Sequence, residues 1–417
     1  MSSEVAQARG VLTDEATERE RACVLAKVGE ASLKGRNKRT FIDALKRNMN
    51  AALDGLARVR SGGSVLEIPL ESEDAAAAVA SRLERVFGLA NASVCLRCER
   101  DPECIADTAM EQFERLHPAT FAVRVRRRDK SFPLTSQQLE REVGAAVQAR
   151  TALPVDLRHP ELELRVELDV GCAYVHVQEI QGAGGLPVGT SGHALSLLSG
   201  GIDSPVSSLL AMKRGLSVDF LHFSGEPYLE PTATTKAQAQ ARVLNGFQAA
   251  RPGALWVVPF GGQQRMLSAV SAEPNRIVLY RRQMLRIGCA LAERLGAAAL
   301  VTGDSLGQVS SQTLPNMASI EDASELPVLR PLLTWDKREI MAKAATIGIL
   351  SLSELPADDA CPLFAGARQR TAVPRSQLLE AEAKLELAEL AEQAAAEARR
   401  TDPGVFLERL EPESRAA

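Results

Sequence analysis

The sequence is poor in aromatic residues and has no long apolar segment. Aromatic residues make up 4% of its 417 residues while hydrophobic residues make up 45%, so alanine, leucine and valine must build the cores. No apolar run reaches the roughly 20 residues that a membrane-spanning helix needs. The first 21 residues are polar and carry several acidic side chains, unlike a secretion signal. These absences predict a globular, cytoplasmic protein outside the membrane.

Cysteines are scarce as well. Seven of them, scattered along a long chain, do not form the framework of a disulfide-rich protein. Cys95 and Cys98 have the spacing of metal ligands, and Cys104 would add a third. No fourth ligand is nearby, and a strand would turn Cys95 and Cys98 to opposite faces. We therefore expect no metal centre in this segment.

Residues 195–206 combine features of an anion-binding turn: LSLLSGGIDSPV. A short apolar run, typical of a buried strand, precedes two glycines, and apolar residues at helical spacing follow Pro205. Gly200 and Gly201 allow a tight turn that a ligand can approach closely, and Ser204 is a candidate helix cap. A P-loop would place a lysine after the second glycine, but Asp203 stands nearby instead, which suits phosphates bound through Mg²⁺.

The C-terminal half alternates strands and helices after a glycine-rich segment at residues 181–187. Strands are expected at 194–198, 218–223, 255–260, 298–302 and 328–333, with a long helix over 275–295. The pattern predicts a parallel sheet covered on both faces, which binds ligands at the carboxyl ends of its strands. That rule selects His222, Phe223 and residues 302–304, although each could be an ordinary strand end. Arg281 and Arg282 could pair with phosphates or be surface charge.

The N-terminal half reads as two small α+β units over residues 23–179, without a catalytic cluster, which favours a binding role. Net charge is −4, so the chain is not an indiscriminate nucleic-acid binder, but basic residues gather locally. They precede a helix beginning near Thr40 and follow a strand over 121–128. The spacing leaves open whether they bind a sugar–phosphate chain or form a solvated face. The candidate nucleic-acid contacts are Lys34, Arg36, Lys38, Arg126, Arg127, Arg128 and Lys130.

Five segments occur in the order expected of tRNA 4-thiouridine synthetases, the ThiI family of tRNA sulfurtransferases. They are 29–33, 126–136, 199–206, 302–312 and 359–364. The third resembles the SGGxDS loop of ATP pyrophosphatases, and the resemblance covers residues 23 to 375. It implies an α/β fold with a parallel-sheet ATP-pyrophosphatase domain (PP-loop, adenine nucleotide alpha hydrolase-like), preceded by α+β ferredoxin-like and THUMP domains.

The resemblance also implies domain boundaries. They are a disordered lead at 1–21, a ferredoxin-like domain at 22–73, a THUMP RNA-binding domain at 74–179, the PP-loop domain at 180–375 and an acidic helical tail at 376–417.

The implied reaction transfers AMP from ATP to the C4 oxygen of the uridine at tRNA position 8, and sulfur then replaces that oxygen to give 4-thiouridine. ATP and Mg²⁺ are the implied cofactors, and tRNA and a cysteine desulfurase the implied partners. A sulfur-carrier protein of thiamine thiazole synthesis and a second copy of the chain are further options. Asp203 and Cys361 are the implied catalytic residues. The implied nucleotide contacts are Leu197, Leu198, Ser199, Gly200, Gly201, Asp203, Ser204, His222, Phe223, Arg281, Gly303 and Gln312.

Cys361 matches the family's catalytic cysteine, but the residues alone do not select it. The acids before it, Asp358 and Asp359, disfavour a thiolate, and a small buried residue is the ordinary alternative. The sequence also departs from the family in two ways. No rhodanese-like domain follows, and Ala360 stands where short members often carry the first of two cysteines. The activation step is therefore better supported than the route of sulfur.

Two rival interpretations stay open. One keeps the ATP site but changes the acceptor to another tRNA position or to a thiazole-pathway protein. The other is an RNA-binding protein with a vestigial ATP site, which the intact loop at 199–204 disfavours. Pyrophosphate release that depends on tRNA would separate the second from an enzyme.

Overall fold

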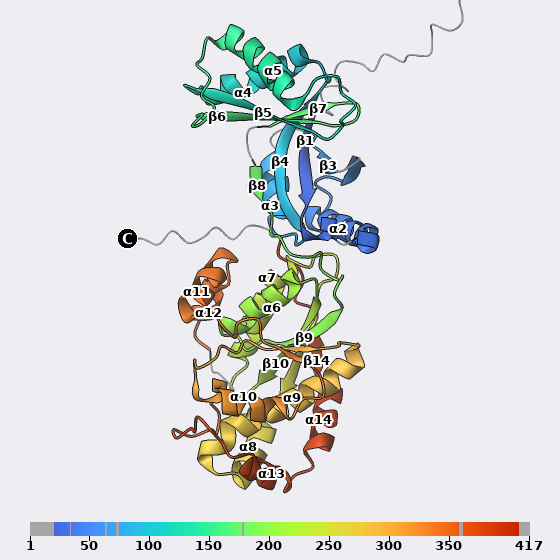
Figure 1. Cartoon of the computed structure of the whole chain (residues 1–417). Coiled ribbons are helices and arrows are strands. Elements are labelled where there is room, and N and C mark those ends of the chain that lie inside the picture. The colour runs from blue at the N-terminus through green and yellow to red at the C-terminus, as the bar shows by residue number, and fades with distance from the viewer. Residues whose placement is uncertain are drawn as a thin grey trace, which may run out of the picture. The chain divides into compact units, whose positions relative to one another are not determined.

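The computed structural model describes residues 21–33, 35–62, 65–71, 75–176, 179–357 and 362–407. They form two compact units, which divide between Gly184 and Gly185 (Figure 1).

The first unit is built on one mixed sheet of eight strands. Its order is β2-β3-β1-β4-β7-β6-β5, and β8 also pairs with β4. All pairs are antiparallel except β5 with β6, so the two α+β units expected from the sequence share a continuous sheet. The elements are β1 (Ala22–Val28), η1 (Glu30–Leu33), η2 (Gly35–Asn37), α2 (Lys38–Leu53), β2 (Arg60–Gly62), β3 (Val65–Pro69), α3 (Ala75–Leu83), β4 (Leu89–Cys98), α4 (Pro102–Leu116), β5 (Phe121–Arg127), α5 (Ser136–Thr151), β6 (Leu162–Leu168), β7 (Ala173–His176) and β8 (Glu179–Gln181).

Two helix pairs cover this sheet and form separate cores. Helices α2 and α3 pack on β1, β3 and β4 through Leu45, Met49 and Val79. Helices α4 and α5 pack on β5, β6 and β7, where the rings of Phe113 and Phe121 meet edge to face at 5.3 Å. Because α3 belongs to the first core, the first α+β layer extends past residue 73, where the sequence suggests a boundary, into β4.

The opposite face of the sheet holds buried polar and thiol groups. Glu167 of β6 is 3% exposed and pairs with Arg128 and, at 2.7 Å, with Lys27 of β1. Burial alone would raise the pKa of Glu167, but the interaction with His176 and these two cations lower it well below its usual range. Cys23 and Cys95 lie on this face, and burial raises the pKa of both thiols, so they are unreactive.

The second unit is an α/β structure with a parallel sheet. Strand order is β13-β12-β9-β10-β11-β14, and only β14 at the edge is antiparallel. The expected strands and the long helix are present. The elements are β9 (His193–Leu197), α6 (Asp203–Lys213), β10 (Ser217–Ser224), α7 (Thr232–Asn245), β11 (Leu255–Pro259), α8 (Gly261–Val270), η3 (Glu273–Asn275), α9 (Arg276–Leu295), β12 (Leu300–Val301), η4 (Ser310–Gln312), α10 (Leu314–Glu321), β13 (Val328–Leu329), α11 (Lys337–Thr346), α12 (Leu350–Glu354), α13 (Arg375–Glu382), α14 (Leu387–Ala396) and β14 (Arg399–Thr401).

Helices lie on both faces of this sheet (Figure 1). On one face the Ser196 hydroxyl of β9 lies 2.8 Å from the Ser208 hydroxyl of α6. On the other face Leu195 packs in the large core that α9 organises. This alternation along β9 is what burial of a strand on both faces requires.

The segment after residue 375 is part of this core. Leu378 of α13 and Leu387 and Ala391 of α14 are buried in the core that α9 organises, and β14 adds the edge strand next to β11. The sequence predicts an acidic helical tail here. The apolar face of α14 instead packs on α9, because alanine and leucine recur at helical spacing among the acids.

Candidate nucleotide site

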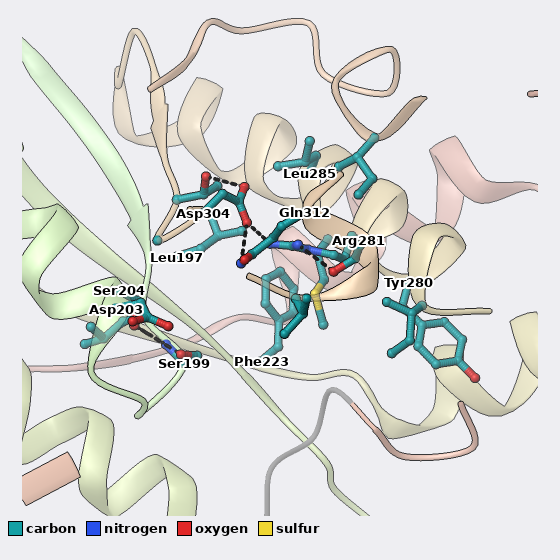
Figure 2. A pocket seen from close by; sticks show the side chains of 18 of the residues that line it. Leu197, Ser199, Asp203, Ser204, Phe223, Tyr280, Arg281, Leu285, Asp304 and Gln312 are labelled. Carbon is teal, nitrogen blue, oxygen red and sulfur yellow. Dashed lines mark hydrogen bonds and ion pairs between the residues drawn. The ribbon is translucent and has the colours of Figure 1, made fainter. Parts of the chain in front are cut away.

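A cavity of about 450 Å³ opens at the carboxyl ends of β9, β10 and β12, within the range of about 300–1,000 Å³ typical of ligand sites. Figure 2 shows two polar groups on its wall: the turn with Ser199, Asp203 and Ser204, and a cluster around Asp304. Apolar side chains such as Leu197 and Phe223 lie between them. This arrangement suits an elongated ligand. Its flat ring system would contact the apolar side chains, and its polar end would contact one of the polar groups.

The turn at residues 199–204 is tightly built. Gly200 has a φ of +86°, which favours glycine. The Ser199 N–H donates to the Ser204 hydroxyl at 3.0 Å, and the Gly201 N–H donates to the Ser199 hydroxyl at 3.3 Å. The expectation that Ser204 caps the helix is wrong: α6 begins at Asp203, and the Ser204 hydroxyl bonds back to the turn instead.

Gly303 brings the end of β12 against this turn. A Cβ at Gly303 would lie 2.7 Å from the Ser204 nitrogen, closer than real Cβ contacts. Only glycine therefore lets β12 approach the first turn of α6, and this approach closes one side of the cavity.

Asp203 is held by two side chains that sequence reasoning missed. Its two carboxylate oxygens accept bonds from Lys337 of α11 and Gln308 of the loop after β12, each at 3.0 Å. Lys337 lies 134 positions away in the chain, so no local pattern joins it to the turn. One signal was available: Lys337 is the first residue of a helix, where the helix dipole disfavours a cation unless another contact holds it.

The second polar group is centred on Asp304, which is 3% exposed. Its carboxylate pairs with Arg281 and accepts bonds from the Thr302 hydroxyl at 2.8 Å and the Gln312 amide at 3.4 Å. Burial alone would raise the pKa of Asp304, but the guanidinium groups of Arg281 and Arg330 lower it, so this buried carboxylate is charged.

Arg281 and Arg282 have different environments. The Arg281 guanidinium donates to Ser311 at 3.0 Å and lines the cavity. Arg282 is 1% exposed and bonds to Glu382 of α13 at 2.6 Å, so it is neither a surface charge nor a phosphate ligand.

His222 and Phe223 both line the cavity, at the end of β10. The His222 Nδ1 lies 2.8 Å from the Leu198 carbonyl oxygen, which can only accept, so Nδ1 carries the proton. Phe223 packs edge-on against Phe260 at 5.3 Å. The sequence-selected residues Leu197, Leu198, Gly303 and Gln312 line the same cavity.

Cys361 lies outside the described residues, as do Asp358, Asp359 and Ala360. Pro362, the residue after Cys361, lines the cavity together with Gln369.

The nucleic-acid candidates of the first unit divide into two groups. Lys38, Arg126 and Lys130 are exposed. Arg127 donates to the Leu134 carbonyl at 2.7 Å, and Arg128 pairs with buried Glu167, so both are engaged within the unit. Lys34 and the side chain of Arg36 lie outside the described residues.

In the described part of the chain, no helix is both long and apolar enough to cross a membrane. Within the same residues, no three histidine, cysteine or acidic side chains gather in a way that could hold a metal ion.

Comparisons with known proteins agree with this architecture. Three sequence-family profiles match: a ThiI ferredoxin-like domain at residues 23–93, a THUMP domain at 99–178, and a profile described as thiamine biosynthesis protein (ThiI) at 189–387. The fold class expected from the sequence is thereby confirmed.

Curated relatives match along most of their length. A protein of Nocardia farcinica described as a probable tRNA sulfurtransferase is 43% identical over 379 residues, which cover 89% of this chain and 92% of the relative. A Thermus thermophilus protein with the same description is 40% identical over 362 residues, covering 87% of this chain and 89% of the relative.

Solved structures are similar too. The crystal structure of a 4-thiouridine synthetase–RNA complex with bound ATP superposes with a TM-score of 0.83 at 32% identity, covering 92% of this chain and 99% of that one. The structure of PH1313 from Pyrococcus horikoshii, at 23% identity and a TM-score of 0.60, covers 78% of this chain and 99% of that one and shares the fold.

Proposed function

The chain belongs to the tRNA sulfurtransferase family, and from that premise we propose that it is the enzyme that converts uridine 8 of tRNA to 4-thiouridine with ATP. The observation that carries the proposal is the cavity at the strand ends, which is lined by Ser199, Asp203 and Ser204 of the turn. Lys337 contacts the Asp203 carboxylate. A vestigial ATP site would not keep a turn whose hydroxyls, glycines and charges are all in place. Because the proposed substrates are tRNA and ATP, we expect the reaction to take place in the cytosol.

ATP occupies the cavity with its phosphates at the turn. Ser199, Gly200, Gly201 and Ser204 form the turn that holds the pyrophosphate part, and the Lys337 ammonium supplies positive charge. Leu197, Leu198, His222, Phe223 and Gly303 form the walls for the nucleoside part. Arg281 and Gln312 orient it through the Asp304 cluster.

The donor set at the turn fits a magnesium ion. Mg²⁺ in nucleotide enzymes commonly binds one or two carboxylates together with substrate phosphates and waters. Asp203 offers one partly exposed carboxylate beside the turn, whereas Asp304 is buried between two guanidinium groups. Asp203 would hold the ion, which when bound neutralises phosphate charge. Lys337 and Gln308 keep the Asp203 carboxylate in place.

In the first step the C4 oxygen of the uridine attacks the α-phosphorus of ATP, and pyrophosphate leaves. A uracil carbonyl is a poor electrophile, and loading its oxygen with AMP provides a good leaving group. The Ser199 and Ser204 hydroxyls and Lys337 stabilise the charge of the departing pyrophosphate. The buried Asp304 carboxylate is charged and holds the Arg281 guanidinium in place. It takes no part in proton transfer.

In the second step a persulfide on Cys361, loaded by a cysteine desulfurase, attacks C4 with its terminal sulfur. AMP leaves with the former C4 oxygen, and the uridine is joined to Cys361 through a disulfide. A second thiolate attacks the Cys361 sulfur, leaving the outer sulfur on the base, and a further thiol reduces the new disulfide. Cys289, the one cysteine within the described residues of the second unit, lies in α9 at 3.3 Å from the Ser324 hydroxyl. Because Cys289 is not among the described residues that line the cavity, we propose that an external reductant completes the cycle, or that sulfide attacks the activated base directly.

Nucleoside mass analysis of tRNA from cells lacking the gene tests the proposal, since 4-thiouridine should disappear. In vitro, Asp203→Asn should abolish tRNA-dependent pyrophosphate release and leave tRNA affinity unchanged. Unchanged 4-thiouridine in the deletion strain, or wild-type pyrophosphate release by Asp203→Asn, contradicts it.

The description of the matching profile as a thiamine biosynthesis protein supports a second acceptor. The same Cys361 persulfide would pass sulfur to the adenylated carboxyl terminus of a sulfur-carrier protein for the thiazole of thiamine. A deletion strain should then need thiazole or thiamine for growth, and growth without either rules out this role.

A further inference from the structure

A buried glutamine of α7 holds the backbone of the turn at residues 199–204. Gln240 is fully buried, and its side-chain nitrogen donates to the Gly200 carbonyl at 2.9 Å and to the Gly201 carbonyl at 3.2 Å. Carbonyl oxygens can only accept, so the NH₂ group of the amide must face them. The turn rests on α7, since a Cβ at Gly200 would lie 3.5 Å from the Ala233 carbonyl oxygen.

A second helix fixes the same amide. The Ser353 hydroxyl of α12 accepts a bond from the Gln240 nitrogen at 2.9 Å. One turn earlier on α7, Lys236 donates to the Leu355 carbonyl, just after α12, at 2.7 Å. The Gln240 Oε1 accepts no bond from the described residues, so the amide acts at this place through its nitrogen. With three acceptors around that nitrogen, the amide has little freedom to turn away from the two glycine carbonyls.

These bonds set the direction of the N–H groups of the turn. In a planar trans peptide unit, the C=O and the N–H of the next residue point in opposite directions. The carbonyls of Gly200 and Gly201 point toward Gln240. The N–H groups that follow them, those of Gly201 and Ile202, therefore point away from α7. The Gly201 N–H accordingly donates to the hydroxyl of Ser199, which lines the cavity, so the side of the turn opposite Gln240 is the cavity side.

The two glycines would not keep this direction by themselves. Glycine adopts many backbone conformations at similar free energy, so the peptide units around Gly200 and Gly201 can rotate unless another group holds them. A rotated unit would present a carbonyl oxygen to the cavity, and its partial negative charge would repel a phosphate. An external donor on the α7 side favours the one orientation that presents N–H groups to an anion.

We propose that Gln240 is a positioning residue that keeps the N–H groups of Gly201 and Ile202 directed at the pyrophosphate part of ATP. Gln240 is not among the described residues that line the cavity, so it acts through the turn and not by touching the nucleotide. The inference rests on the proposed function, because it takes the turn as the pyrophosphate site.

Binding of two partial ligands to the full-length protein tests the inference by calorimetry with Mg²⁺ present. Inorganic pyrophosphate probes the turn, and adenosine probes the walls for the nucleoside part. Gln240→Met keeps the length of the side chain and loses its donors, and Gln240→Asn withdraws the amide by one methylene. Both variants should raise the Kd for pyrophosphate at least about tenfold, because misdirected donors no longer meet the phosphate charge. The Kd for adenosine should stay within about twofold of wild type, since the walls keep their contacts.

A kinetic measurement follows the same variants. Both should lower kcat/KM for ATP in tRNA-dependent pyrophosphate release at least about tenfold, because the leaving pyrophosphate loses directed donors. Their tRNA affinity should be unchanged. Thermal unfolding followed by fluorescence checks that each variant is folded, and Gln240→Asn carries the test if Gln240→Met does not fold.

Gln248→Met is the matched control. Gln248 is 2% exposed, and its nitrogen donates to the Val218 carbonyl at 2.8 Å, so it too is a buried glutamine that holds the backbone. Val218 lies near the start of β10, whereas the cavity lies at the carboxyl end of that strand. Gln248→Met should lower the melting temperature and leave the Kd for pyrophosphate unchanged.

Three outcomes overturn the inference. An unchanged Kd for pyrophosphate in both Gln240 variants would mean that the turn keeps its orientation without the amide. An equal rise in the Kd for adenosine would mean that the substitutions distort the whole cavity. An equal rise in the Kd for pyrophosphate in Gln248→Met would mean that general destabilisation is the cause.

The proposed function fails separately. Wild-type protein that releases no pyrophosphate from ATP in the presence of tRNA contradicts the proposed function and the inference with it. Wild-type protein that releases pyrophosphate, together with Gln240 variants that match it, contradicts only the positioning role.

Discussion

Lys337 lies at the start of α11 and contacts the Asp203 carboxylate at 3.0 Å, so its charge faces the place where we put the phosphates. We predict that Lys337→Ala lowers kcat/KM for ATP in tRNA-dependent pyrophosphate release at least about tenfold. A bond to a charged group is worth about 1.5–3 kcal/mol, and the variant also removes the positive charge that balances Asp203 at the turn. Steady-state kinetics at varied ATP measure the effect. Arg338→Ala removes the neighbouring exposed charge and should keep a kcat/KM near that of wild type. If both variants lose kcat/KM equally, the effect comes from the positive charge of this surface as a whole and not from Lys337.

On β5 and the loop after it, only some of the basic residues face solvent. Neutralising exposed Arg126 and Lys130 should reduce the salt slope of tRNA affinity by about 1.5, since each phosphate contact contributes about 0.7–0.9. Affinity measured between low and moderate salt gives the slope. Arg127→Met should instead lower the stability of the first unit, because Arg127 holds the Leu134 carbonyl. An unchanged salt slope for the double variant would mean that Arg126 and Lys130 form an ordinary solvated surface and do not contact tRNA phosphates.

At the scale of elements, Glu382 joins α13 to α9. Its carboxylate bonds to Arg282 and Arg286 at 2.6–2.9 Å and is 9% exposed. Glu382→Gln should lower the free energy of unfolding by about 3 kcal/mol, because the two guanidinium groups lose a buried partner. Burial would raise the pKa of Glu382, but these guanidinium groups lower it. The stabilisation is therefore complete above the unfolded value of about 4.3 and is lost as the pH falls through the lower folded pKa.

Urea unfolding of Glu382→Gln and wild type near neutral pH and below about pH 4 checks this prediction. The difference between the two should be largest near neutral pH and shrink on acidification. The matched control is Glu392→Gln, which breaks the exposed pair between Glu392 of α14 and Arg294 of α9. It should cost less than about 1 kcal/mol. If Glu392→Gln lowers the free energy of unfolding as much as Glu382→Gln does, stability depends on the overall charge of these helices rather than on the buried ion pair.

Elements whose signals are local were predictable from the sequence. The strands β9, β10 and β11 and the helix α9 follow from apolar runs and helical periodicity, and the tight turn at residues 199–204 follows from its glycines. Contacts between distant segments were not predictable. Nothing near Asp203 indicates Lys337, and the helical spacing of alanine and leucine in α14 indicates a buried face without revealing that its partner is α9. The left-handed backbone of Phe364 is enforced by Tyr228 and Arg276, so no local pattern predicts it.

At the scale of the whole molecule, both tryptophans, Trp256 and Trp335, belong to the second unit. Tryptophan fluorescence therefore reports on the nucleotide-binding unit alone, while circular dichroism reports on both units. ATP at a hundred times its Kd should stabilise the second unit by about 2.7 kcal/mol. The fluorescence-detected transition should shift to higher temperature while the transition of the first unit stays in place.

Sulfate at matched ionic strength controls for unspecific anion effects. If ATP shifts the fluorescence and circular dichroism transitions by the same amount, the two units unfold together as one cooperative unit. The division between Gly184 and Gly185 would then separate compact units that are not independently stable.

The position of β14 and α14 affects how the protein is made. During translation the first unit has all its strands once residue 181 has emerged from the ribosome, so it can fold while the rest is being synthesised. The second unit can complete its fold only much later in translation. Its α9 is complete at residue 295, but the helix that covers it begins at residue 387, and the strand that closes the β11 edge ends at residue 401. Until then an apolar helix face and an open strand edge are exposed on the nascent chain, which is the state that chaperones recognise.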